Sequence, residues 1–163
     1  MTETTIDRRR LLILGGGALA LVPFAGCMSR GPSGDSVRMT RDGAPLFADI
    51  RSSNSLGAIR GDRDLETAAV VQAGYMAQAG RMAHETGIGR SFRTRMGSVK
   101  TNGAAAENLA RGRMDLVRVM DIWMNSPGHR RNMLDPKFAR FGLGYVTDPR
   151  DPAQRYWAMV LAA

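Results

Sequence analysis

The residues of this sequence that could do chemistry are two histidines and one carboxylate. His84 and His129 are the chain's two imidazoles, and Glu107 lies between them in the sequence, flanked by small and apolar residues. Two imidazoles and a carboxylate can bind zinc and leave coordination positions open for water or substrate. The same groups can act as a general acid and base. The remaining interpretation is structural, with both imidazoles partly buried and hydrogen-bonded to Glu107 and to the backbone.

Sequence spacing does not decide between these interpretations. A helical zinc motif would need a second histidine at position 88, and isoleucine stands there. A Gly-x-Ser-x-Gly nucleophile elbow is absent from the sequence. The methionines recur at helical intervals, which is typical of core packing. The glycines at 142 and 144 belong to a strand pattern and not to a phosphate-binding loop.

Residues 1–26 have the features of an export signal. Three arginines, Arg8 to Arg10, precede an uncharged run over residues 11–25. A run of ~15 residues is too short to cross a ~30 Å hydrocarbon core as a permanent helix, so we expect a cleavable segment. The paired arginines and the glycines of this run favour twin-arginine export, with Sec export as the alternative.

Cys27 is the chain's single cysteine, and it closes Phe24-Ala25-Gly26-Cys27, which resembles a lipobox. We therefore expect lipidation at Cys27 and anchoring in a membrane by several acyl chains. The alternative is an ordinary signal peptide with Cys27 incidental. Residues 27–44, which contain Gly, Pro and Ser, are expected to form a flexible tether. The folded domain is then expected over residues 45–163.

The charge of the chain indicates what it could adhere to. Its formal net charge is +8, which favours contact with anionic lipid or with a polyanionic cell wall. The arginines are dispersed and are not interleaved with aromatic residues, so nucleic acid is not an expected partner.

Hydrophobic periodicity predicts a layered α+β domain. The clearest helix is expected over residues 64–79, with Asp64 capping its first turn and Gly80 ending it. The other expected elements are helices over residues 45–53 and 114–125, loops over 57–63 and 147–155, a break at Ser126-Pro127-Gly128, and strands over 141–146 and 156–161.

Five segments then combine into a recognisable order. They are Gln72-x-x-x-Met76-Ala77 upstream of His84, Gly103-x-x-x-Glu107-Asn108-Leu109-Ala110, Trp123-Met124-Asn125-Ser126-Pro127-Gly128-His129-Arg130-x-Asn132-Met133-Leu134, Phe141-Gly142-Leu143-Gly144-Tyr145 and Tyr156-Trp157. Together they resemble the CAP superfamily, which includes cysteine-rich secretory proteins, insect venom antigens and plant pathogenesis-related proteins. The resemblance covers about residues 45–162.

The resemblance implies a three-layer α-β-α sandwich around an antiparallel sheet. It also implies a cleft lined by two histidines and two acidic residues. His84, Glu107 and His129 match three of these four positions, and Ser126 stands at the fourth. The missing carboxylate puts any acid/base role that depends on it in doubt, and the set that is left could hold zinc through His84 and His129.

The favoured function is a non-enzymatic binding module for a lipid or a cell-envelope ligand. Members of the superfamily have been linked to lipid binding and to partner proteins, which the resemblance extends to this chain. A metal-dependent or acid/base hydrolase acting on peptide or cell-wall material is one alternative. A structural envelope protein with a vestigial cleft is another. In each case we expect an exported protein, anchored in the membrane at the periplasmic face or on the cell surface.

Overall fold

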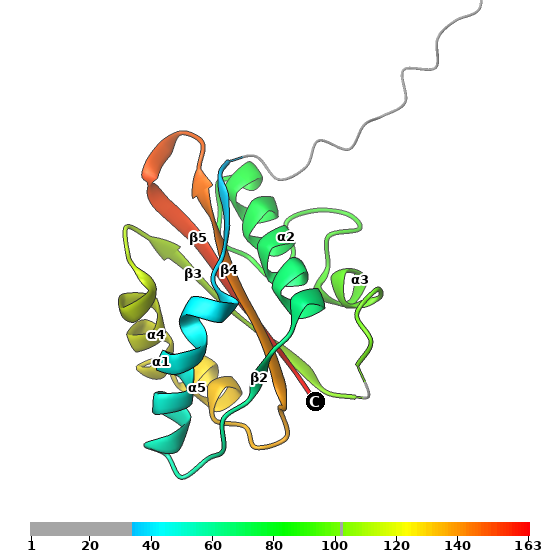
Figure 1. Cartoon of the computed structure of the whole chain (residues 1–163). Helices are drawn as coiled ribbons and strands as arrows, with labels where there is room; N and C mark the ends of the chain where they lie inside the picture. The colour runs from blue at the N-terminus through cyan, green and yellow to red at the C-terminus, as the bar shows by residue number, and fades with distance from the viewer. Residues whose placement is uncertain (1–33, 102) are drawn as a thin grey trace, which may run out of the picture.

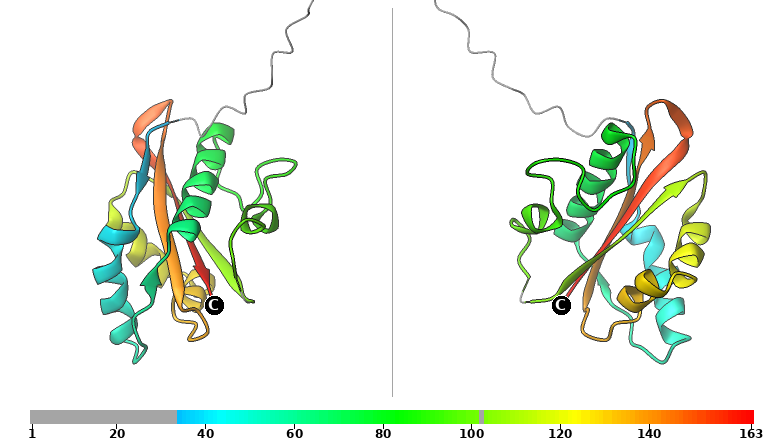
Figure 2. Two further views of the ribbon diagram at one scale, coloured as in Figure 1. Left: turned by 45° about the vertical axis from the view of Figure 1, so that its right-hand side comes forward. Right: turned by 180° about the vertical axis from the view of Figure 1, so that it is seen from behind.

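The computed structural model describes residues 34–101 and 103–163, so the expected signal peptide, the lipobox and Cys27 lie outside the described residues. Within these two ranges no helix is both long enough and apolar enough to cross a membrane. The described chain is a sheet with helices on both faces (Figures 1 and 2). The expected α+β sandwich with an antiparallel sheet is therefore confirmed.

The sheet has five strands, and its main path runs β1-β4-β5-β3 with antiparallel pairing throughout. Strand β2 pairs only with β4 and is parallel to it. Strand β5 lies between β4 and β3, and its residues 156–162 are all buried, which explains their continuous apolar run. The strands are β1 (Ser36–Arg38), β2 (Arg60–Gly61), β3 (Ala105–Gly112), β4 (Arg140–Asp148) and β5 (Asp151–Ala162).

The helices divide between the two faces of the sheet, as Figure 2 shows. Helix α2 (Arg63–Ala79) packs on β4 and β5 from one side, with the short α3 (Phe92–Met96) beside it. The opposite face is covered by α1 (Thr40–Ser52), α4 (Leu116–Met124) and α5 (Pro127–Met133). Each face has its own apolar core, one centred on α2 and the other on Trp123 and Trp157.

Local signals explain why α2 begins and ends where it does. The cap is Asp62 and not the expected Asp64, because the Asp62 carboxylate accepts the backbone N–H groups of Asp64 at 2.9 Å and Leu65 at 3.1 Å. Gly80 ends the helix in the left-handed conformation with φ 67°. Fully buried alanines on its inner face let the helix approach the sheet closely. This close approach places α2 directly over Gly142 of β4.

The domain begins earlier than the sequence suggested. Strand β1 and the first turn of α1 lie within the segment expected to be tether. Val37 pairs with Tyr145 of β4, and the hydroxyl of Thr40 accepts the backbone N–H of Leu143 at 2.9 Å. A three-residue strand is too short to show a period of its own. Only its pairing with β4 reveals it.

Further elements differ from the sequence prediction, including β2 within the expected loop over residues 57–63 and α3, for which no element was predicted. Ser126-Pro127 ends α4 as expected but also starts α5, with proline in the first turn where its missing N–H costs nothing. Most of the expected loop over residues 147–155 is strand, and the turn is confined to Pro149-Arg150. The Glu107 segment, for which no element was predicted, is strand β3.

The β4–β5 turn contains a carboxylate whose ionisation stabilises the fold. Asp148 is buried and accepts the backbone N–H of Arg150 at 3.0 Å, its Nε at 2.8 Å and the Tyr156 hydroxyl at 3.2 Å. Arg150 also donates to the carbonyl oxygen of Ala77 near the end of α2 at 3.0 Å. The hydrogen bonds from Arg150 are the main cause that lowers the pKa of Asp148 to about 2.

This carboxylate gives the first testable prediction. Because the folded pKa of Asp148 lies below its unfolded value, its stabilising effect is fully present above pH ~4 and is lost as the pH falls towards 2. Asp148→Asn is expected to lower the free energy of unfolding by about 1–2 kcal/mol at pH 7. Urea denaturation from pH 7 to pH 2.5 measures both effects. Equal loss of stability below pH 4 in the wild type and the variant would contradict the assignment.

Candidate functional site

The centre of the candidate site is the carboxylate of Glu107 on strand β3. Its side chain is 2% exposed, and both of its oxygens are engaged. Oε2 lies 2.9 Å from Nδ1 of His84, and Oε1 accepts a hydrogen bond from Nη2 of Arg95. The buried charge is therefore compensated by a guanidinium and contacted by an imidazole.

His84 reaches Glu107 from the segment between α2 and α3. Its side chain is 61% exposed, so one part of the ring faces solvent while Nδ1 faces the carboxylate. The segment is held in place by hydrogen bonds from buried side chains to its backbone. Gln72 of α2 donates to the carbonyl oxygen of Ala83, and Arg95 of α3 donates to those of His84 and Arg90. The hydrogen bond to Glu107 that the structural interpretation predicted is thus found for His84, but its ring is mostly exposed and not partly buried.

His129 lies on α5 and approaches the same region from the other side of β3. Its ring is half-buried, and its Nδ1 atom is buried without a hydrogen-bond partner among the described residues. Burial is the main cause that lowers the pKa of His129, and the charge of nearby His84 lowers it further. The lowered pKa favours the neutral imidazole. Unlike His84, it forms no hydrogen bond with Glu107 in the described structure.

Two asparagines join α5 to β3 beneath these groups. Asn108 is fully buried, and its amide donates to the carbonyl oxygen of His129 at 3.1 Å. Asn132 of α5 donates to the side-chain oxygen of Asn108 at 2.9 Å. These contacts explain why an asparagine follows Glu107 and why another lies three residues after His129. Both asparagines belong to the sequence motifs given above, but the motifs indicate no role for them.

Beside His129 is a cleft of about 400 Å³ between β3, α4 and the segment that follows α2. Most of the side chains that line it are apolar, and Arg81 and Arg111 are exposed lining residues. His84 and Glu107 lie close by but are not among the lining residues. The lining residues are Arg81, Met82, Leu109, Ala110, Arg111, Met114, Ile122, Ser126 and His129.

The arrangement does not fit a zinc site. No group of three or more histidine, cysteine, aspartate and glutamate side chains in the described ranges is placed to hold a metal ion. Glu107, the one carboxylate in the expected set, already binds Arg95 and His84 through its two oxygens. The two imidazoles alone are fewer ligands than the three that protein zinc sites usually supply.

Arg95 is the functional residue that sequence reasoning missed. Its side chain is 3% exposed and binds the carboxylate at the centre of the site. In the sequence it is one of three arginines between residues 90 and 95, and the other two have nothing that distinguishes them from it. Only the packing of α3 against α2 shows that this one is turned inward. Ser126, at the position of the missing carboxylate, is the cap residue of α5 and lines the cleft.

Several solved structures are similar to this fold. An outer surface protein of Borrelia burgdorferi matches with a TM-score of 0.67 and 20% identity, over 79% of this chain and 97% of that one. An extracellular SCP-domain protein of Bacillus anthracis matches with a TM-score of 0.66 and 25% identity, over 76% of this chain and 39% of that one. A cysteine-rich secretory protein of Staphylococcus aureus matches with a TM-score of 0.59 and 19% identity, over 76% of this chain and 38% of that one.

Sequence comparison gives a consistent result. The chain is 50% identical over 42 residues to the uncharacterized protein YkwD of Bacillus subtilis, a stretch that covers 26% of this chain and 16% of that protein. The chain thus spans a small part of this relative's length. The family description "CAP: Cysteine-rich secretory protein family" matches residues 46–161. With this match over most of its length and a sandwich shared with extracellular and outer-surface proteins, the chain belongs to the CAP, or cysteine-rich secretory protein, family.

Proposed function

We propose that this chain is an exported, Cys27-anchored binding module that holds an anionic acyl lipid in the cleft beside His129. The observation that carries the proposal is the lining of this cleft. Leu109, Met114 and Ile122 offer an apolar wall, which suits an acyl chain. Two arginines, Arg81 and Arg111, are also among the lining residues, which suits an anionic head group.

The charges near the cleft support a carboxylate or phosphate head over a neutral one. Arg81 and Arg111 line the cleft, and the side chains of both are exposed. Guanidinium groups bind carboxylates and phosphates through paired hydrogen bonds. Burial lowers the pKa of His129 and favours its neutral form, so it adds a polar contact to the cleft. The volume of about 400 Å³ is within the range of small-molecule pockets.

The hydrolase stays the less favoured alternative. Its acid/base chemistry would need a carboxylate that is free to act with an imidazole. Glu107 is instead bound by Arg95 and His84. A structural envelope role without a ligand is the third candidate, and it is an outcome of the experiment below.

The test uses cis-parinaric acid, a fluorescent fatty acid, with the purified full-length chain and two matched variants. Met82 is 51% exposed and lines the cleft, whereas Ile88 is fully exposed and lies outside the lining. Met82→Glu places a negative charge on the apolar wall and is expected to weaken binding at least about tenfold. Ile88→Glu is expected to bind as the wild type does.

The outcomes separate the candidates. Saturable fluorescence enhancement that Met82→Glu abolishes and Ile88→Glu preserves supports the binding module. Binding that is equal in both variants overturns the assignment to this cleft. No binding by the wild type overturns the lipid proposal and leaves the structural role ahead.

A further inference from the structure

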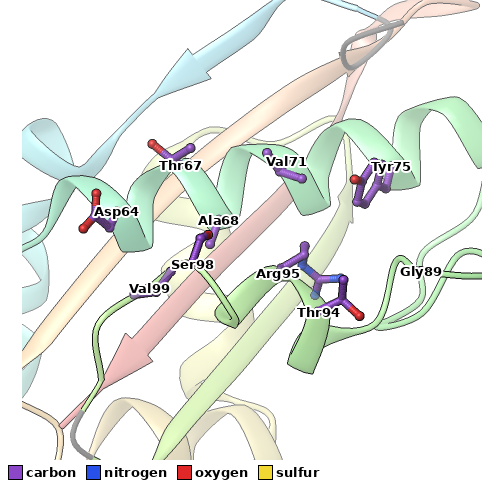
Figure 3. A pocket seen from close by; sticks show the side chains of 10 residues that line it. All are labelled: Asp64, Thr67, Ala68, Val71, Tyr75, Gly89, Thr94, Arg95, Ser98 and Val99. Carbon is purple, nitrogen blue, oxygen red and sulfur yellow. The ribbon is translucent and has the colours of Figure 1, made fainter. Parts of the chain in front are cut away.

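A second cavity lies away from the cleft, between α2 and the segment over residues 89–99. Figure 3 shows side chains that converge on it from the helix on one side and from α3 and its flanking residues on the other. Its volume is about 340 Å³, at the lower end of small-molecule pockets. It shares no lining residue with the cleft beside His129. The lining residues of this α2–α3 pocket are Asp64, Thr67, Ala68, Val71, Tyr75, Gly89, Thr94, Arg95, Ser98 and Val99.

The lining of the α2–α3 pocket combines hydroxyl groups with small apolar side chains. Tyr75 and Ser98 supply hydroxyls that can donate and accept a hydrogen bond. The hydroxyl of Thr67 is already bonded to Arg63 and Arg38, and that of Thr94 to Ser91. The apolar contacts come from Ala68, Val71 and Val99, which are short and leave room for a ring. Such alternation of hydroxyls and apolar surface matches a ligand with polar edges and apolar faces.

The charges in the pocket favour a neutral ligand. Asp64 contributes an exposed carboxylate, which repels anions. Arg95 contributes a buried guanidinium, and the Arg90 guanidinium lies 4.6 Å from the centre of the Tyr75 ring, so cations are also repelled. A ligand that carries hydroxyl groups but no net charge avoids both penalties.

Arg95 lines the pocket, and its side chain is held in place by hydrogen bonds to the neighbouring elements. Its Nη1 donates to the carbonyl oxygens of His84 and Arg90, and its Nη2 donates to Glu107. Its Nε atom is buried and has no hydrogen-bond partner among the described residues. Because this atom is shut off from solvent, a ligand in the pocket does not reach it, and Arg95 serves as a fixed part of the pocket wall.

We propose that the α2–α3 pocket binds one pyranose unit of a neutral glycan. The ring hydroxyls pair with Tyr75, Ser98 and the Asp64 carboxylate, and an apolar ring face packs on Val71. This site is independent of the lipid proposed for the cleft, because the two cavities have no lining residue in common.

Isothermal titration calorimetry of the full-length chain tests the site with two neutral probes, the β-1,4 trimer of N-acetylglucosamine and maltotriose. We expect saturable binding of at least one probe, and which one binds tells an amino-sugar glycan from a glucan. Ser98 is exposed, so Ser98→Trp can fill the pocket from its edge and is expected to weaken binding at least about tenfold. Ser53→Trp, at an exposed serine that follows α1, is the matched control and is expected to bind as the wild type does.

A second variant keeps the test valid if Ser98→Trp perturbs the fold. Tyr75→Phe removes only the phenolic oxygen and keeps the ring, and it is expected to weaken binding several-fold while the melting temperature is unchanged. No heat with either probe overturns the proposal. Binding that both pocket variants leave at the wild-type affinity also overturns it, because the sugar is then held elsewhere.

Discussion

Gly142→Ala is expected to destabilise the domain by about 4 kcal/mol or more, or to prevent folding altogether. A β-carbon at position 142 would overlap the backbone of Leu65 and Glu66 in the first turn of α2. Backbone atoms cannot rotate out of the way as a flexible side chain can, so the helix itself would have to move.

Moving α2 would break contacts that depend on its position. The Glu66 carboxylate accepts the backbone N–H of Thr40 at 3.1 Å and a hydrogen bond from Arg38 at 3.1 Å, which joins the helix to β1 and α1. Gly57→Ala is the matched control, because that glycine is exposed and nothing lies within 4 Å of the added carbon. Its free energy of unfolding is expected to stay within ~0.5 kcal/mol of the wild type. If urea denaturation gave Gly142→Ala and Gly57→Ala the same free energy of unfolding, the close packing of α2 on β4 would be contradicted.

Glu107→Leu is the second change with a large expected effect, a loss of about 3–5 kcal/mol in the free energy of unfolding. The substitution removes the carboxylate but leaves the guanidinium of Arg95, which is 3% exposed, without its charged partner. His84 also loses the contact that fixes its ring. Glu85→Leu is the matched control, since Glu85 is an exposed glutamate next to His84 in the sequence. That variant is expected to change stability by less than ~0.5 kcal/mol.

A double-mutant cycle distinguishes the buried ion pair from simple loss of packing. Adding Arg95→Met to Glu107→Leu removes the unpaired charge, so the double variant is expected to be more stable than Glu107→Leu alone. Recovery will be partial, because Arg95 also donates to the carbonyl oxygens of His84 and Arg90. A double variant that is less stable than Glu107→Leu alone would show that the unpaired charge of Arg95 is not what destabilises Glu107→Leu.

The site could be predicted from the sequence in part. His84, Glu107 and His129 do come together around β3, and the His84–Glu107 contact was one of the arrangements considered. Zinc binding through the histidines is not supported by the geometry, because Arg95 occupies the carboxylate that a metal would need. The side-chain hydrogen bond between Asn108 and Asn132 connects residues that are 24 positions apart, and no local sequence pattern predicts such a pair.

The sequence by itself determined the features that depend on residues close together in the chain. Helix α2 has its cap, its small-residue face and its terminal glycine within one short stretch, and β4 and β5 have strand patterns of their own. Tertiary structure alone decided that β1 belongs to the sheet, that the Glu107 segment is a strand, and that Arg95 is buried. The physical reason is the same in each case. A short strand and a buried charge exist only through partners distant in the sequence, and those partners meet only when the two helical layers close on the sheet.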